Sequence, residues 1–147
     1  PGLEALEHMG EKSFLSTLAA WLAEALYEQG RDDEAAALTQ ASEAAAAPDD
    51  VVSQVGWRFV RAKLLARRGA SGEGERLARE AVALAELTDM PDLRGDALWA
   101  LAEVLDEPAE AASALEQAAA TFEQKGNEVS AARARAARDE LQEVSGS

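Results

Sequence analysis

Apolar residues recur three and four positions apart along almost the whole chain, which is the spacing of one face of an α-helix. The alternation of apolar and polar residues that marks a half-buried strand is absent, and the chain contains no isoleucine. Apolar residues make up 48% of the chain but aromatic residues only 5%, and much of the rest is alanine, the strongest helix former. We therefore expect an all-α fold.

Seven helical segments are predicted from this periodicity. They cover residues 12–29, 33–47, 51–68, 73–88, 92–105, 108–125 and 128–142. Gly30, Gly69 and Gly126 each follow a segment, where glycine commonly ends a helix. Pro48 lies between two segments, and Pro108 suits the first turn of the segment that it opens.

The turn regions repeat along the chain. Residues 27–35 align with residues 66–74, and Gly30 and Gly69 are about 39 residues apart, close to the roughly 34 residues of helix–turn–helix repeats. Small residues recur near the middle of each first helix and at the start of each second helix, where they let neighbouring helices approach. These residues are Ala23, Ala62, Ala102, Ala35, Gly74 and Ala111.

Residues 22–35, 56–69 and 122–135 resemble tetratricopeptide (TPR) repeats. Together they are similar to the C-terminal TPR region of large bacterial signalling proteins, in which a cyclase-like or DNA-binding head and a regulatory ATPase precede the repeats. The resemblance implies a sensor or assembly arm without catalytic residues. Two features depart from the pattern: Gly74 replaces the usual alanine, which weakens a helix by about 1 kcal/mol, and the turn at 106–108 lacks glycine.

The resemblance also implies an architecture. We expect a right-handed α-α superhelix of about three helix pairs, followed by a C-terminal capping helix. The predicted pairs are residues 12–47, 51–88 and 92–125, the cap is 128–142, and the lead-in 1–11 and the tail 143–147 flank this repeat domain.

The charge of the chain limits the partners that we expect. The net charge is −14, which disfavours nucleic acid and anionic membranes. No cysteine is present, and the sequence has neither a membrane-spanning apolar stretch nor a signal peptide, so we expect a cytoplasmic location. The Pro-Gly start and Ser-Gly-Ser end suggest a fragment of a longer protein.

The sequence offers no defensible catalytic, cofactor or metal site. His8 is the single histidine, so a site built on paired histidines is excluded, and a surface or capping role is expected for it. The glycine-rich segment 69–74 lacks the lysine of a phosphate-binding loop and is predicted to be a turn. No serine or threonine has a base beside it in a nucleophile arrangement. We therefore predict that the chain is not an enzyme.

A cluster of basic residues in segment 51–68 admits two interpretations. It contains Arg58, Arg61, Lys63, Arg67 and Arg68. These side chains either form ion pairs with acidic residues of adjacent repeats, which we favour, or line a basic strip that holds an acidic peptide or carboxylate. The arginines of the predicted cap, namely Arg133, Arg135 and Arg138, are expected to face solvent.

The aromatic residues divide into core and groove candidates. Trp21, Trp57 and Trp99 fall in the first helices of the three pairs and are expected in the core, whereas Tyr27 and Phe59 are expected to be exposed. In TPR-like arrays the first helices line the concave face. The residues predicted to face that groove are Thr17, Glu24, Tyr27, Glu28, Phe59, Lys63, Arg67, Trp99 and Glu103.

Three functions remain open at this point. The first is a protein-interaction or regulatory scaffold module that binds a protein, a peptide or another domain of its parent protein. The second is a small-molecule sensor, which requires an enclosed pocket of several hundred Å³ with a few convergent polar groups. The third is a homo-oligomerisation module, because repeats with uncovered ends can stack into a homodimer.

Overall fold

Short turns join a series of helices in the computed structural model, which describes residues 2–146. The helices are α1 (Gly2–Glu28), α2 (Asp32–Ala45), α3 (Val51–Arg67), α4 (Ser71–Ala85), α5 (Pro91–Val104), α6 (Pro108–Gln124) and α7 (Glu128–Gly146). Over this range no strand occurs, so the predicted all-α class is confirmed.

The same backbone motif ends α1, α3 and α6. Gly30, Gly69 and Gly126 take positive φ angles of 77°, 89° and 80°, which glycine adopts without steric cost. The residue after each glycine donates its N–H to the carbonyl five residues back, as Arg31 does to Leu26 at 2.9 Å. This is the Schellman arrangement, and it confirms the three glycine stops.

Both ends of the chain are more helical than predicted. α1 begins at Gly2, so the helix start at residue 12 is wrong and residues 2–11 continue the first helix. Segment 3–9 consists mainly of good helix formers, and a single glycine inside a helix, here Gly10, costs only about 1 kcal/mol. α7 extends to Gly146 rather than ending at residue 142, since no proline stops it.

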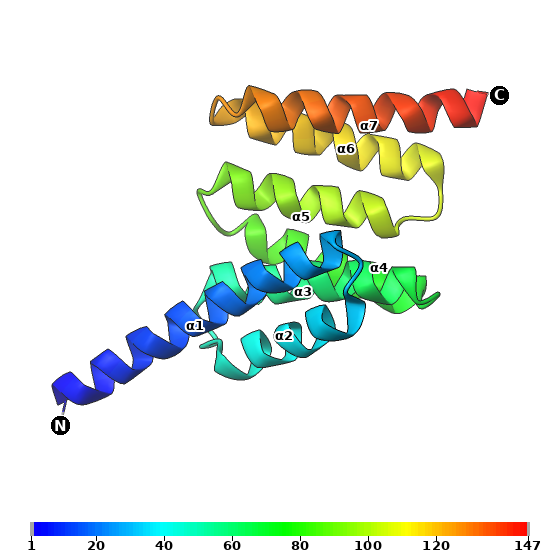
Figure 1. The fold of residues 1–147 in the computed structure, drawn as a ribbon. Coiled ribbons are helices and arrows are strands. Elements are labelled where there is room, and N and C mark those ends of the chain that lie inside the picture. The colour runs from blue at the N-terminus through cyan, green and yellow to red at the C-terminus, as the bar shows by residue number, and fades with distance from the viewer. Residues whose placement is uncertain (1, 147) are drawn as a thin grey trace.

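The helices pack as consecutive pairs, α1 with α2, α3 with α4 and α5 with α6, and α7 lies along α6. Figure 1 shows them stacked in this order, with α2 at one edge and α7 at the other. α3 is central because it contacts α1, α2, α4 and α5. Its Val55, Val60 and Leu64 are at most 2% exposed and form the middle of the core.

Small residues mark the closest helix contacts, as predicted. All six of the small residues singled out in the repeat are buried. At three positions a methyl group would have almost no space: a Cβ would lie 3.0 Å from Ala20 Cβ at Gly56, 2.7 Å from the Ala62 carbonyl oxygen at Gly74, and 2.5 Å from the Phe122 ring at Gly95. The close packing of these helices therefore depends on glycine, which has no side chain.

α1 carries small residues on its inner face and large apolar residues on its outer face. Ser16 and Ala20 are buried against the rest of the molecule, and Ser16 and Ser42 exchange hydroxyl-to-carbonyl hydrogen bonds of 2.8 Å between α1 and α2. Trp21 lies on the opposite face and is 62% exposed, so its predicted place in the core is wrong. The inner face leaves no room for an indole ring because serine and alanine set the helix spacing there.

Candidate functional site

A groove runs across the first helices of the pairs and reaches the last helix. Its cavity measures about 230 Å³ and is open to solvent. Glu24 and Glu28 come from α1, Phe59 and Lys63 from α3, and Asp96, Trp99, Ala100 and Glu103 from α5, while Phe122 of α6 and Ser130 and Arg133 of α7 complete the lining.

Most of the predicted groove residues meet here. The groove contains Glu24, Glu28, Phe59, Lys63, Trp99 and Glu103 of the predicted set. Phe59 lines the groove but is only 5% exposed, so its predicted exposure is wrong: its ring packs into the core beneath the groove. Glu24 and Glu28 are four residues apart, and so are Phe59 and Lys63. Residues at this spacing share a helix face, which explains why they cluster.

Tyr27 and Arg67 lie beside the groove and contact one another. The Arg67 guanidinium stacks 3.7 Å from the centre of the Tyr27 ring and also pairs with Asp32. Burial raises the pKa of Tyr27, and the negative charge of Glu103 adds to this effect, whereas Arg67 opposes it. Tyr27 therefore stays neutral and anchors Arg67 at the edge of the groove.

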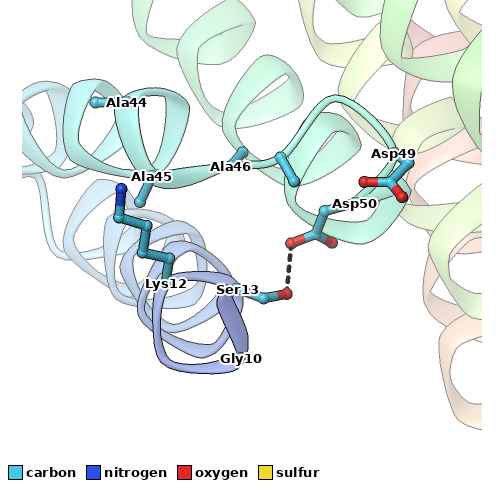
Figure 2. A pocket seen from close by; sticks show the side chains of 9 residues that line it. Gly10, Lys12, Ser13, Ala44, Ala45, Ala46, Asp49 and Asp50 are labelled. Carbon is cyan, nitrogen blue, oxygen red and sulfur yellow. Dashed lines mark hydrogen bonds between the residues drawn. The ribbon is translucent and has the colours of Figure 1, made fainter. Parts of the chain in front are cut away.

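Thr17 belongs to a separate polar network. Its hydroxyl hydrogen-bonds Ser53 Oγ at 2.9 Å, and Ser53 Oγ donates to Asp50 Oδ2, also at 2.9 Å. Ser13 Oγ donates to the same carboxylate oxygen from α1 (Figure 2). Thr17 does not line the groove, because it lies two turns of α1 before Glu24, where the start of α3 packs against that helix.

Figure 2 shows a second cavity, between α1 and the connection from α2 to α3. It measures about 530 Å³, is open, and is lined mainly by small residues together with Lys12, Asp49 and Asp50. The Asp50 side chain accepts the Ser53 N–H at 3.3 Å and so caps the start of α3. Because its main polar group already serves the fold, this cavity is a weaker candidate site than the groove.

Lys63 is the polar side chain at the base of the groove. It is only 6% exposed, and the ion pairs within the described part of the chain do not include its ammonium. Its ammonium lies 4.6 Å from the centre of the Tyr27 ring and 5.6 Å from that of Phe59, which stabilises the charge through cation–π attraction. These rings accept no conventional hydrogen bond, so the ammonium keeps donors for a group in the groove.

Carboxylates surround this lysine. Asp96 is exposed, but it lies in a concave part of the surface where protein displaces much of its solvation, and this desolvation together with Glu24 and Asp92 raises its pKa from 3.8 to about 7, against the charge of Lys63. Desolvation likewise raises the pKa of Glu103, and Lys63 opposes that shift. Repulsion and desolvation therefore disfavour full ionisation of the groove carboxylates at neutral pH.

The shift at Asp96 predicts a pH dependence of stability. Between about pH 4 and pH 7 the folded chain holds a proton on Asp96 that the unfolded chain releases, so this group's contribution to stability decreases as pH rises through that window. Asp96→Asn should raise the midpoint of urea unfolding at pH 7.5 and flatten its dependence on pH, whereas Asp89→Asn, at an exposed position, should change neither. Equal pH profiles for Asp96→Asn and the unmodified chain would contradict the assignment.

The other basic residues of α3 are engaged within the molecule. Arg61 pairs with Glu43 at 2.9 Å, and Arg68 pairs with Asp33 at 3.5 Å. Arg58 and Arg61 lie over the Trp57 ring, each with its guanidinium carbon 4.4 Å from the ring centre. With the Arg67–Asp32 pair, these contacts confirm ion pairing for Arg61, Arg67 and Arg68. Lys63 is the one member of the predicted strip that lines the groove.

Some groove residues were not among those predicted from the sequence. Asp96 lies one turn before Trp99 and two turns before Glu103, so its spacing on the helix was a usable signal. Arg133 comes from α7, whose arginines were expected to face solvent. That expectation is wrong for Arg135, which pairs with Glu123 and Glu116 of α6, and for Arg138, which pairs with Glu116.

No group of three or more histidine, cysteine or acidic residues within the described part of the chain could hold a metal ion. The His8 side chain lies outside the described side chains. None of the helices in the described range is both long and apolar enough to cross a membrane. Comparisons with protein-family models, curated proteins and solved structures found no match for this chain.

Proposed function

We propose that this chain is a TPR-like α-α superhelix that works as a protein-interaction module, without an enzymatic activity of its own. Consecutive helix pairs, buried small residues at their contacts and the same glycine motif after three helices support the repeat architecture. Each pair of such an array leaves an apolar face that only its neighbours can cover. The sequence resemblance adds the proposal that the module is a regulatory arm of a larger bacterial signalling protein in the cytoplasm.

The groove carries the functional proposal. Four carboxylates line it, against the two positive charges of Lys63 and Arg133. A partner segment with lysine or arginine side chains would relieve the repulsion among the carboxylates, while its backbone carbonyls could accept from the ammonium of Lys63. An acidic peptide fits less well, because the arginines that would attract it pair with acids of the same chain. We therefore propose a positively charged, extended protein segment as the partner.

Fluorescence anisotropy with labelled peptides tests this proposal. A lysine-rich peptide should bind more tightly than an acidic peptide of equal length, and its affinity should fall as salt is raised, because the attraction between exposed charges is screened. Asp96→Asn combined with Glu103→Gln should weaken binding about tenfold, which corresponds to about 1.4 kcal/mol. Glu140→Gln, at an exposed position of α7 outside the groove, is the matched control and should leave the affinity unchanged.

Two outcomes would contradict the proposal. The first is tighter binding of the acidic peptide, and the second is equal affinity of the groove variant and the Glu140→Gln control. The alternative of a small-molecule sensor has less support. The groove is open, and its volume of about 230 Å³ lies below the roughly 300–1,000 Å³ typical of ligand pockets. The cavity of about 530 Å³ is large enough but also open, and its Asp50 already caps the start of α3.

A further inference from the structure

The outer face of α1 is a continuous apolar surface. Its five large side chains are Phe14 (66% exposed), Leu15 (57%), Leu18 (36%), Trp21 (62%) and Leu22 (47%). Their spacing of one, three and four residues places them on one side of the helix. No charged residue occurs from position 13 to position 23, so no charge interrupts this face. A helix that is apolar on both faces is normally covered on both.

The size of this surface also indicates a binding role. Since a whole aromatic side chain has an area of about 150–250 Å² and a leucine somewhat less, the exposed parts of the five side chains amount to roughly 500 Å². The largest apolar patch on a typical monomer is about 300–600 Å² and often has a function. Scattered exposed residues, such as Leu87 in the turn after α4, are ordinary by comparison.

We propose that a second copy of this chain covers the outer face of α1, in an antiparallel pairing whose two-fold axis passes near Leu18. In this pairing Leu18 contacts Leu18 of the second copy, Phe14 faces Leu22 of the second copy, and Leu15 faces Trp21 of the second copy. The same five side chains serve both sides, as an interface with two-fold symmetry requires. Complete coverage of these side chains in two copies would bury roughly 1,000 Å², which is the lower limit of about 1,000 Å² for a specific interface.

The other end of the stack does not offer a matching surface. The exposed positions of α7 include Ala132, Arg133, Ala136 and Glu140, and Val129 is the one large apolar side chain exposed there among those that the structure describes. Head-to-tail stacking would therefore place the apolar face of α1 against a polar and small-residue surface. Pairing of α1 with α1 is the arrangement that matches large apolar side chains with large apolar side chains.

The net charge of −14 makes the proposed contact distinguishable from binding at the groove. Two copies repel one another, and salt screens this repulsion while leaving apolar burial in place. Dimerisation through α1 should therefore strengthen as salt is raised, whereas binding of a basic peptide weakens. Glu24 and Glu28 line the groove one and two turns beyond Trp21 on α1, and the opposite salt dependence separates the two proposals.

Analytical ultracentrifugation across a concentration series at two salt concentrations tests the pairing. The chain should form a concentration-dependent dimer with a lower dissociation constant at the higher salt. Leu18→Glu places two carboxylates together at the two-fold axis and should raise the dissociation constant at least tenfold. Val129→Glu, at a 72% exposed position of α7, is the matched control and should behave as the unmodified chain. Circular dichroism melts would establish that both variants fold.

A cross-linking measurement addresses geometry, since the chain contains no cysteine. Under mild oxidation Leu18→Cys should form a disulfide-linked dimer much faster than Val129→Cys, because the two-fold axis brings the two thiols together. A monomer at all concentrations and salts, or equal cross-linking rates for the two cysteine variants, would overturn the proposal.

Discussion

Phe122→Ala is expected to lower the free energy of unfolding by about 3–5 kcal/mol, the largest effect of any single substitution that we consider. Phe122 is 2% exposed and packs against Ala118, Ala119, Ala131 and Ala134, which are too small to fill the space that the ring leaves. Urea unfolding followed by circular dichroism measures the change. Leu87→Ala removes a side chain that is 79% exposed and should stay within about 0.5 kcal/mol of the unmodified chain.

Gly95 provides an internal control for this contact. A Cβ at Gly95 would lie 2.5 Å from a ring carbon of Phe122, so Gly95→Ala alone should cost about 1–3 kcal/mol by overpacking. In the Phe122→Ala background the same substitution has room, and the better helix propensity of alanine should make it stabilising by up to about 1 kcal/mol. A Gly95→Ala effect of the same sign in both backgrounds would show that the two residues do not share one space.

Gly74→Ala is expected to destabilise the chain by about 1–3 kcal/mol, although alanine is the better helix former. The new Cβ would lie 2.7 Å from the Ala62 carbonyl oxygen and 3.4 Å from the Ala66 nitrogen, and backbone atoms of α3 cannot move aside as a flexible side chain would. The contact between α3 and α4 at this point thus explains why position 74 carries glycine and not alanine.

Gly72 supplies the matched control, two residues earlier in α4. A Cβ there would meet nothing within 4 Å, so Gly72→Ala should instead stabilise the chain, by up to about 1 kcal/mol. Thermal unfolding of the two variants in one buffer compares them directly. If both substitutions raise the midpoint, the close approach of α3 and α4 is not what selects glycine at position 74.

The sequence predicted those features that depend on local spacing. Apolar periodicity identified every helix, and Gly30, Gly69 and Gly126 located three helix ends, because both signals act within one or two turns. The sequence was less informative about which apolar face of a helix packs against the rest of the molecule. Trp21 has the same kind of periodicity as a core residue, and only the packing of α1 through Ser16 and Ala20 decides that the indole faces outward.

The candidate groove was predictable in part for a similar reason. The sequence correctly grouped residues that share a face of one helix, such as Phe59 and Lys63, which both line the groove. Contributions from distant helices were missed, because Arg133 reaches the groove only through the placement of α7 along α6. The sequence also left two interpretations of the basic residues open, because whether Arg67 attracts a partner or pairs with Asp32 depends on the distance between two helices, which sequence spacing does not give.

The distribution of the three tryptophans gives this chain a set of built-in optical reporters. Trp21 is exposed on α1, Trp57 is buried in the core and Trp99 lines the groove. Variants that keep one indole and replace the other two by phenylalanine would each emit from one of these environments. A blue shift confined to Trp21 would follow dimerisation, a change confined to Trp99 would follow occupancy of the groove, and Trp57 would respond to unfolding. Self-association, partner binding and loss of the fold could then be followed separately, each with its own variant under the same conditions and without an added dye.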